Sequence, residues 1–176
     1  MTVPQLETER LILRDHRLGD FPAHFAMWSD ARVLRHISGA RRSEEEIWQR
    51  FLRNQGQWQL MGSGMWALEE RATRSYAGSV GFIFARRAID IPYREAPEMG
   101  WVIAPDFHGK GLAREAVAKI LAWGDAHLEA AESWCMINPL NLASRQVAAG
   151  AGFREAGRAR YKDVEMLTFL RPRGAA

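Results

Sequence analysis

Apolar positions alternate with polar ones in several short stretches of the chain, and this period of two predicts β-strands. The opening stretch is one example, because Leu11 and Leu13 alternate with their neighbours between two arginines. Similar runs bounded by glycine, proline and charged residues predict further strands. We expect these strands at Met65–Glu70, Tyr76–Phe84, Met99–Ile103, Ser133–Ile137 and Val164–Leu170.

Apolar residues recur at intervals of three and four in other stretches, a spacing typical of helices with one buried face. One helix is expected to begin at about Leu18. A second begins at Ser43, a capping residue followed by three glutamates on the positive end of the helix dipole, and extends to about Leu60. Leu112–Leu128 is the clearest helix, and Ala143–Gly150 is expected to form a short one.

The order of these elements is a strand, two helices, three strands, then helix, strand, helix and strand. This order predicts an α/β fold of the α+β kind, in which about four helices flank a mixed, largely antiparallel central sheet of about six to seven strands. No linker-like segment and no internal repeat interrupts the pattern. Residues 1–176 are therefore expected to form a single domain.

Composition narrows the class of protein. Hydrophobic residues make up 47% of the chain and charged residues 26%, as in a soluble globular protein. No long apolar run suggests a membrane span, so no membrane partner is expected. The N-terminus lacks the basic-then-apolar order of a secretory signal, and a cytoplasmic location is therefore expected.

Cysteine and histidine occur without the spacing of a metal site. Cys135 is the only cysteine, which excludes an internal disulfide. We expect it to be a buried strand residue and not a nucleophile, because no neighbouring base marks it. The histidines show no metal-ligand spacing, and no metal site is predicted.

The net charge of +3 and the pI of about 9.4 favour anionic ligands. The arginines are scattered and form no continuous basic stripe, so nucleic acid is not expected as a partner. A basic surface that attracts a phosphate-rich cofactor explains the charge equally well.

Residues 101–117 join a predicted strand to the clearest helix through a glycine-rich loop. Pro105 ends the strand because it has no N–H group to donate, and Gly109 and Gly111 let the backbone approach a ligand closely. The first amides of the following helix have no partner within it, and the helix dipole makes that end positive. With Lys110 nearby, this segment suits a phosphate or pyrophosphate.

Two common phosphate motifs do not fit this loop. Arg114 stands where a dinucleotide fingerprint has its third glycine, and Lys110 is not followed by the serine or threonine of a P-loop. A Gly-x-Gly triplet alone is common by chance, so a plain strand-to-helix turn remains the alternative interpretation. The signal lies in the succession of strand, proline, glycine loop and amphipathic helix.

Four segments, in matching order and spacing, carry a resemblance to a known family. They are Leu6–Arg14, Glu98–Trp101, Pro105–Ala113, and Asn138–Ser144 with the following Gly152-Phe153. The third resembles the acetyl-CoA signature of the GNAT superfamily of N-acetyltransferases, and the fourth is similar to its second conserved block. The first two look like the branch typified by ribosomal-protein N-terminal acetyltransferases.

The resemblance implies acetyl-CoA as the acyl donor and the residues that bind it. Backbone groups of Trp101, Val102 and Ile103 would bind the pantetheine arm as an added strand would. Asn141 would contact the pantetheine or the acceptor side. The amides that would hold the pyrophosphate lie in the loop and the helix start, at His108, Gly109, Lys110, Gly111, Leu112 and Ala113.

The resemblance also implies direct transfer of the acetyl group to a primary amine, without an acyl-enzyme. Glu98 is the expected base, directly or through water, because the amine is mostly protonated at neutral pH. Asp163 and Glu165 are the alternative carboxylates. Ser144 would lie near the thioester sulfur, and a backbone N–H of the cofactor strand would polarise the carbonyl.

Two positions depart from the family pattern. His108 stands where Arg or Gln is usual, and it is either a pH-dependent phosphate contact or a loop residue without a role. Ala148 replaces a frequent tyrosine acid, so Ser144 or an ordered water must protonate the leaving thiolate.

These departures keep open the alternative of a non-catalytic acyl-CoA-binding module, and an RNA-binding domain is a third interpretation. The acceptor is left open among a protein N-terminus, an amino acid, a polyamine and an aminoglycoside-like amine. Met61, Trp66 and Phe82 are candidates to line its cavity. A homodimer is expected only because family members often pair.

Overall fold

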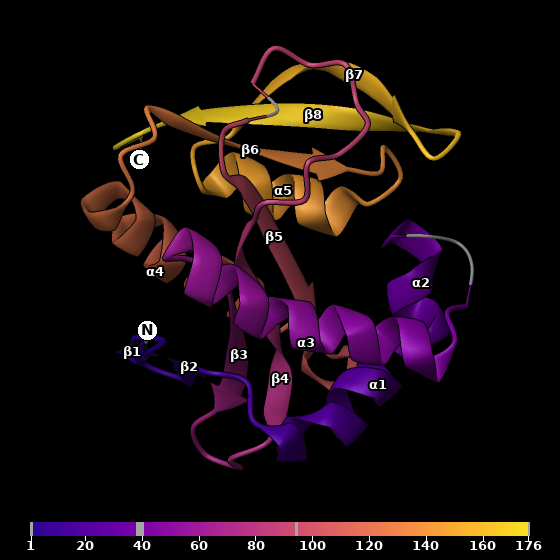
Figure 1. The fold of residues 1–176 in the computed structure, drawn as a ribbon, viewed down its shortest axis with the longest axis vertical. Coiled ribbons are helices and arrows are strands. Elements are labelled where there is room, and N and C mark those ends of the chain that lie inside the picture. Colours follow the sequence, from indigo (N-terminus) through magenta and orange to yellow (C-terminus); the bar gives the residue numbers. More distant parts are fainter. Residues whose placement is uncertain (1, 38–40, 94, 176) are drawn as a thin grey trace.

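The computed structural model describes residues 2–37, 41–93 and 95–175. Within them, eight strands form one sheet in the order β1-β2-β3-β4-β5-β6-β8-β7 (Figure 1). Neighbouring strands are antiparallel except β5 and β6, which are parallel. The strands are β1 (Leu6–Glu7), β2 (Leu11–Arg14), β3 (Met65–Glu70), β4 (Tyr76–Ile83), β5 (Glu98–Ile103), β6 (Glu132–Ile137), β7 (Arg154–Tyr161) and β8 (Val164–Pro172).

The helices begin and end where the local sequence supplies partners for their free backbone groups. At the start of α3, the Ser43 hydroxyl accepts from the Glu46 amide at 3.2 Å, and the Glu46 carboxylate accepts from the Ser43 amide at 2.8 Å. Gly62 ends α3 with a left-handed φ of 67°. The α-helices are α1 (Phe21–Ser29), α2 (Ala31–Ile37), α3 (Glu44–Met61), α4 (Leu112–His127) and α5 (Leu142–Gly150), with 3₁₀ helices η1 (Leu18–Asp20) and η2 (Pro105–Phe107).

The expected fold class is confirmed, with more elements than the sequence pattern indicated. The short β1 and the whole of β7 were not predicted, and β7 was missed because it has few large apolar side chains to alternate. The first expected helix is two helices. Asp30 separates them, because its extended backbone ends α1 and its carboxylate accepts from the Arg32 amide at 2.7 Å in the first turn of α2.

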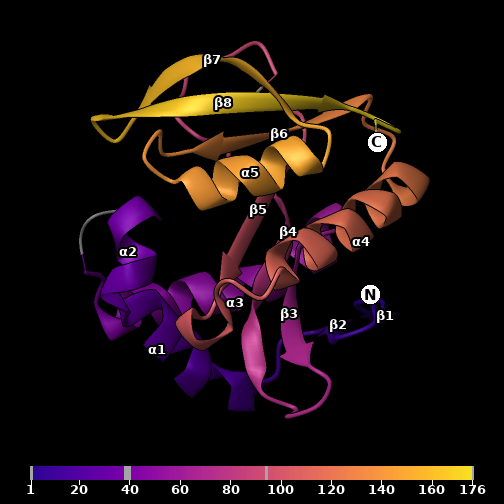
Figure 2. The same ribbon diagram turned by 180° about the vertical axis from the view of Figure 1, so that it is seen from behind.

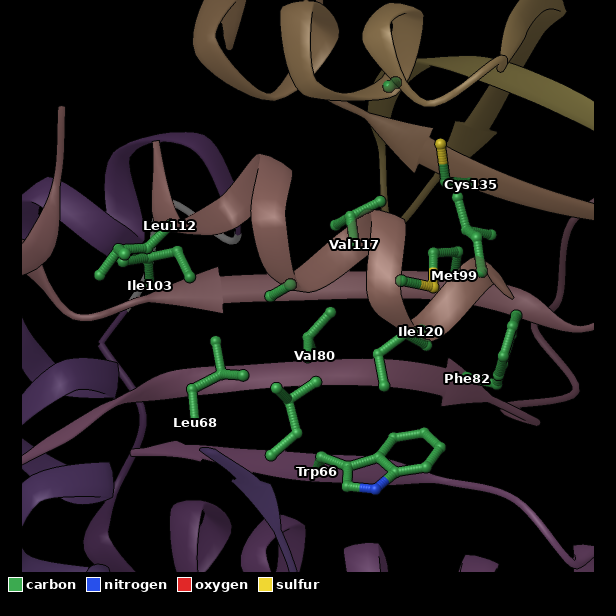
Figure 3. Close-up of a cluster of buried hydrophobic side chains, with 14 of the residues drawn as sticks. Trp66, Leu68, Val80, Phe82, Met99, Ile103, Leu112, Val117, Ile120 and Cys135 are labelled. Atoms are coloured by element: carbon green, nitrogen blue, oxygen red, sulfur yellow. The ribbon is translucent and has the colours of Figure 1, made fainter. Parts of the chain in front are cut away.

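The helices cover both faces of the sheet. Helices α1, α2 and α3 lie on one face and α4 on the other (Figures 1 and 2). The main core lies between α4 and strands β3, β4 and β5 (Figure 3). Large members of this core are Trp66, Leu68, Val80, Phe82, Met99, Ile103, Leu112, Val117 and Ile120.

The prediction that Trp66 and Phe82 line an acceptor cavity is wrong, and that for Met61 stays a prediction. Trp66 and Phe82 are 0% and 2% exposed, because their side chains point into the core beneath α4 (Figure 3). Met61 lies at the end of α3 and is 48% exposed. The tryptophan and phenylalanine therefore stabilise the sheet and do not line a ligand site.

Candidate active site

Strands β5 and β6 are paired at one end only. Their register joins Glu98 to Trp134, and the Trp134 amide donates to the Pro97 carbonyl at 3.1 Å. No second pair follows among the described residues, and the strands diverge (Figure 1). The sheet is therefore split near its centre, directly after Glu98.

The divergence leaves an open strand edge at the expected pantetheine site. Gly100, Trp101 and Val102 are only partly buried, although β5 is a central strand, and Ile103 is buried. Backbone groups on such an edge can bind an extended ligand as an added strand. Trp101, Val102 and Ile103, the residues predicted to bind the pantetheine arm, lie beside the opening.

The two faces of β5 pack against different layers of the fold. Met99 and Ile103 belong to the core beneath α4, whereas Val102 packs with the α1 residues Met27 and Trp28. Since side chains alternate along a strand, Glu98 lies on the same face as Val102. The candidate base therefore faces the layer of α1 and α3.

The loop from β5 to α4 presents a series of free backbone donors. Gly109 and Gly111 have left-handed φ values of 73° and 76°, which glycine adopts without strain. The amides from Gly109 to Arg114 donate no hydrogen bond to any acceptor among the described residues. Gly111 caps α4 without a side-chain hydrogen bond, so these donors and the helix dipole converge on one place.

Two side chains hold this loop in position. The Nε2 atom of His108 donates to the Ile103 carbonyl at 2.8 Å, which ties the loop to the end of β5. Neither interpretation of His108 from the sequence included this contact. On the other side, Arg10 donates to the Lys110 carbonyl at 2.7 Å and pairs with Glu115 on α4 at 2.6 Å. The loop conformation is thus fixed by contacts outside it.

The start of α5 holds the two other expected residues. Asn141 caps this helix, because its side-chain oxygen accepts from the Ser144 amide at 3.1 Å. The Ser144 hydroxyl is partly exposed and has no hydrogen bond to the described residues, so it is available to a ligand. Ala148, one turn further, is fully buried in the main core. Ala148, which replaces the family's frequent tyrosine acid, is therefore a core residue.

Glu98 is 6% exposed and makes a two-pronged ion pair with Arg87. The Nε and Nη2 atoms of Arg87 donate to the two carboxylate oxygens of Glu98 at 2.5 and 2.8 Å. Burial disfavours a charged guanidinium, but hydrogen bonding to Glu98 raises the pKa of Arg87. The Arg87 guanidinium also lies 4.8 Å from the ring centre of Tyr161, at the end of β7. The sequence did not reveal that Arg87 binds Glu98, the candidate base, or that Tyr161 packs on Arg87.

The alternative carboxylates and Cys135 lie in different surroundings. The side chain of Asp163 is 94% exposed in the β7–β8 turn, and that of Glu165 is 61% exposed and pairs with Arg158 at 2.7 Å. Cys135 is 1% exposed on β6, and burial raises the pKa of its thiol. The expectation of a buried strand cysteine is confirmed, and Glu98 is the buried carboxylate beside the split in the sheet.

An acetyltransferase (GNAT) domain model matches residues 10–154. The chain belongs to the GNAT family. This result agrees with the split between β5 and β6 and with the free amides before α4.

Individual relatives of this GNAT domain are similar over nearly its whole length. The uncharacterised N-acetyltransferase YoaA of Bacillus subtilis (strain 168) is 30% identical over 157 residues, which cover 88% of this chain and 85% of the relative. An acetyltransferase structure from Agrobacterium tumefaciens is 25% identical with a TM-score of 0.82, covering 97% and 95% of the two chains.

A more distant structure shares the fold of this GNAT domain. The ribosomal L7/L12 α-N-protein acetyltransferase RimL, solved in complex with coenzyme A, has a TM-score of 0.78 at 17% identity, and the match covers 98% and 100% of the two chains. The GNAT domain described here is thus an N-acetyltransferase, and its family uses acetyl-CoA as donor. This finding favours the enzyme over the non-catalytic module and the RNA-binding domain.

The GNAT domain also contains a buried polar cluster between β4 and the early helices. His16 Nε2 lies 3.1 Å from Ser79 Oγ, and His24 Nδ1 lies 2.9 Å from the Tyr76 hydroxyl, which in turn is 2.6 Å from Ser79 Oγ. Burial lowers the pKa of His16 to about 4 and that of His24 to about 3. Both rings are therefore neutral at pH 7.

In the described part of the GNAT domain, no three His, Cys, Asp or Glu residues gather to hold a metal ion. Over the same residues, no helix is long and apolar enough to span a membrane.

Proposed function

We propose that this enzyme transfers an acetyl group from acetyl-CoA to a primary amine by direct attack. The observation that carries the proposal is the run of unpartnered amides from Gly109 to Arg114 beside the open edge of β5. The amides suit the pyrophosphate, and the edge suits the amide groups of the pantetheine arm. Residues 1–176 would act as one domain.

The arrangement of free donors fits the cofactor better than a plain turn would. A strand-to-helix turn needs neither two left-handed glycines separated by one residue nor a helix start without a side-chain cap. His108 and Arg10 hold the amides in place before any ligand arrives, which lowers the entropic cost of binding. Lys110 adds positive charge nearby, while its Nζ rests 5.0 Å from the ring centre of Phe107.

Acetyl-CoA supplies the activated acetyl group as a thioester. Glu98 accepts a proton from the amine, directly or through a water, so that the nitrogen lone pair can form the new C–N bond. Arg87 holds Glu98 in a fixed position through its two hydrogen bonds. As the amide forms, its nitrogen releases a second proton to solvent. As the C–S bond breaks, the Ser144 hydroxyl protonates the leaving sulfur and regains a proton from solvent.

The test is a thiol-release assay across a library of primary amines. We expect free thiol to appear only when both acetyl-CoA and an amine are present. The Glu98→Gln variant should release thiol much more slowly while binding CoA with near-normal affinity. CoA binding without amine-dependent thiol release from any acceptor would contradict the proposed reaction.

A further inference from the structure

Two arginines lie against the ring of one tryptophan of α1. Arg50 belongs to α3, and Arg42 precedes that helix. The guanidinium carbon of Arg50 lies 3.9 Å from the ring centre of Trp28, and that of Arg42 lies 5.7 Å from it. Trp28 is 3% exposed and belongs to the apolar cluster against which Val102 of β5 packs. We call these three residues the Trp28 cluster. It lies on the same face of β5 as Glu98.

Positive charge around the Trp28 cluster exceeds negative charge. Burial, and then the charges of Arg53, Arg42 and Arg87, lower the pKa of Arg50 to about 9, whereas Glu98 raises it. Glu98 is the one carboxylate acting on Arg50 there, and both of its oxygens already bind Arg87. In the described residues, Arg42, Arg50, Arg53 and Arg87 thus outnumber the two carboxylates nearby, Glu98 and Glu46, and Glu46 acts on Arg42 while it accepts from the Ser43 amide.

The Trp28 cluster also contains buried donors without acceptors. The indole Nε1 of Trp28 and the Nη1 of Arg42 are buried and have no hydrogen-bond partner in the described part of the chain. Arg50 has neither a hydrogen bond nor an ion pair with the described residues. Buried polar groups are normally satisfied, and each unsatisfied one costs about 1–3 kcal/mol. An arrangement of donors alone is complementary to a group with acceptors alone, namely an oxyanion.

The position of the Trp28 cluster indicates that this anion is part of the acceptor and not of the cofactor. The pyrophosphate of the cofactor has its own donors in the amides from Gly109 to Arg114. Trp28 belongs to the apolar cluster against which Val102 packs, so the Trp28 cluster covers the face of β5 that also carries Glu98. An amine that reaches Glu98 along this face passes α1 and α3.

We propose that Trp28, Arg42 and Arg50 form a subsite for an oxyanion of the acceptor, so that the preferred acceptor is a primary amine bearing a carboxylate or a phosphate. This inference rests on the proposed acetyl transfer and names its substrate class. The guanidinium groups of Arg42 and Arg50 and the indole N–H of Trp28 donate to the oxyanion. Its charge offsets the excess of arginines, and the amine remains free to meet Glu98.

The first experiment compares amines that differ only in the anion. Thiol release is measured with β-alanine against β-alaninamide, phosphoethanolamine against ethanolamine, and an amidated peptide with an acidic second residue against its glutamine counterpart. In at least one pair, the anionic member should have a kcat/KM at least about tenfold higher, as expected for a hydrogen bond to a charged group. The pair with the largest ratio shows whether the anion is a small carboxylate, a phosphate or an acidic peptide side chain.

Variants then assign the preference to the Trp28 cluster. Arg50→Gln should remove most of the preference by raising KM for the anionic amine, and Arg50→Lys should restore part of it because the charge returns. Arg154→Gln is the matched control, since Arg154 is exposed on β7 and has no ion pair among the described residues. CoA affinity should be the same in all three variants and the wild type.

Thermal stability separates a binding role from a structural one. If Arg50 is kept for an anion, Arg50→Gln should leave the melting temperature of the free enzyme unchanged or raise it, because an unpaired, partly buried charge is removed. The preferred anionic amine should then raise the melting temperature of the wild type more than that of the variant.

Three results would overturn the inference. Equal kcat/KM within every amine pair removes the subsite but leaves the acetyl transfer standing. Loss of CoA affinity in Arg50→Gln, with the amine preference intact, assigns the Trp28 cluster to the cofactor. Absence of thiol release with every amine overturns the acetyl transfer and the subsite together.

Discussion

The substitution Gly111→Glu tests the phosphate site at the start of α4. Gly111 has a φ of 76° and a ψ of 3°, so any side chain there is strained by about 1–2 kcal/mol. A Cβ atom at this position would meet only Arg10 Nη2, at 3.6 Å, so there is space for the side chain. Arg10 already pairs with Glu115 and does not neutralise the new carboxylate.

The expected loss of CoA affinity follows from the charges. At about 6 Å and an effective dielectric constant of about 40, two unit charges repel by about 1.4 kcal/mol, so two phosphate charges cost about 2.8 kcal/mol. Since about 1.4 kcal/mol corresponds to a factor of ten, the Kd for CoA should rise about 100-fold. Gly111→Ala adds strain without charge, and its Kd should rise less than about tenfold.

Calorimetric titration with CoA measures these affinities. Gly174→Glu is the matched control, because Gly174 also has a left-handed φ of 74° and no atom within 4 Å of an added Cβ. Both glutamate variants should lose a similar free energy of unfolding, but only Gly111→Glu should lose CoA affinity. The loss should shrink between about 0.05 M and about 0.5 M salt, since salt screens exposed charges. Equal CoA affinity of the two glutamate variants would refute the assigned phosphate site.

Three further predictions concern the base, the core and pH. Glu98→Gln should lower kcat at least about 100-fold, the usual contribution of a general base, with CoA affinity near normal; an unchanged kcat excludes Glu98 as the base. Gly124→Ala should lower the urea midpoint, because its Cβ would lie 2.5 Å from Phe82 Cζ and overpacking costs about 1–3 kcal/mol. Combining it with Phe82→Leu should recover part of the loss. If the double variant recovers nothing, this steric explanation is contradicted. The folded pKa values of His16 and His24, about 4 and about 3, lie below the unfolded value near 6.5. The unfolded state therefore binds more protons, and the free energy of unfolding should fall as pH drops below about 6.5, by up to about 1.4 kcal/mol per pH unit for each histidine. Urea unfolding between about pH 5 and 6.5, where most carboxylates stay ionised, should show a smaller slope for His24→Gln, and an unchanged slope excludes His24 as a source.

The conformation of the loop between β5 and α4 could be predicted because its determinants are close together in the sequence. Pro105, Gly109 and Gly111 fix the strand end and two left-handed turns by local backbone chemistry alone. The helical spacing of α4 follows directly after them. His108 was interpreted incompletely, because its partner is the Ile103 carbonyl, which becomes a neighbour only when the loop folds back.

The partners on the acceptor side could not be predicted, because they come from distant parts of the chain. Arg87 lies in the irregular loop between β4 and β5, where no periodic pattern indicates its direction, and Tyr161 contacts Arg87 from β7, a distant strand that the pattern did not reveal. Trp28 is buried like an ordinary core residue. The contacts of its ring with Arg42 and Arg50 show that this part of the core carries positive charge, and they form only when the chain is folded.

The most direct test of the account is an NMR titration of the isotope-labelled enzyme with coenzyme A, in which the backbone amide signals are followed residue by residue. The account predicts the largest shifts and the strongest protection from hydrogen exchange at the amides from Gly109 to Arg114, which have no hydrogen-bond partner among the described residues. Smaller changes should follow along β5 from Trp101 to Ile103. Saturable binding of coenzyme A that leaves the amides from Gly109 to Arg114 unchanged would contradict the account.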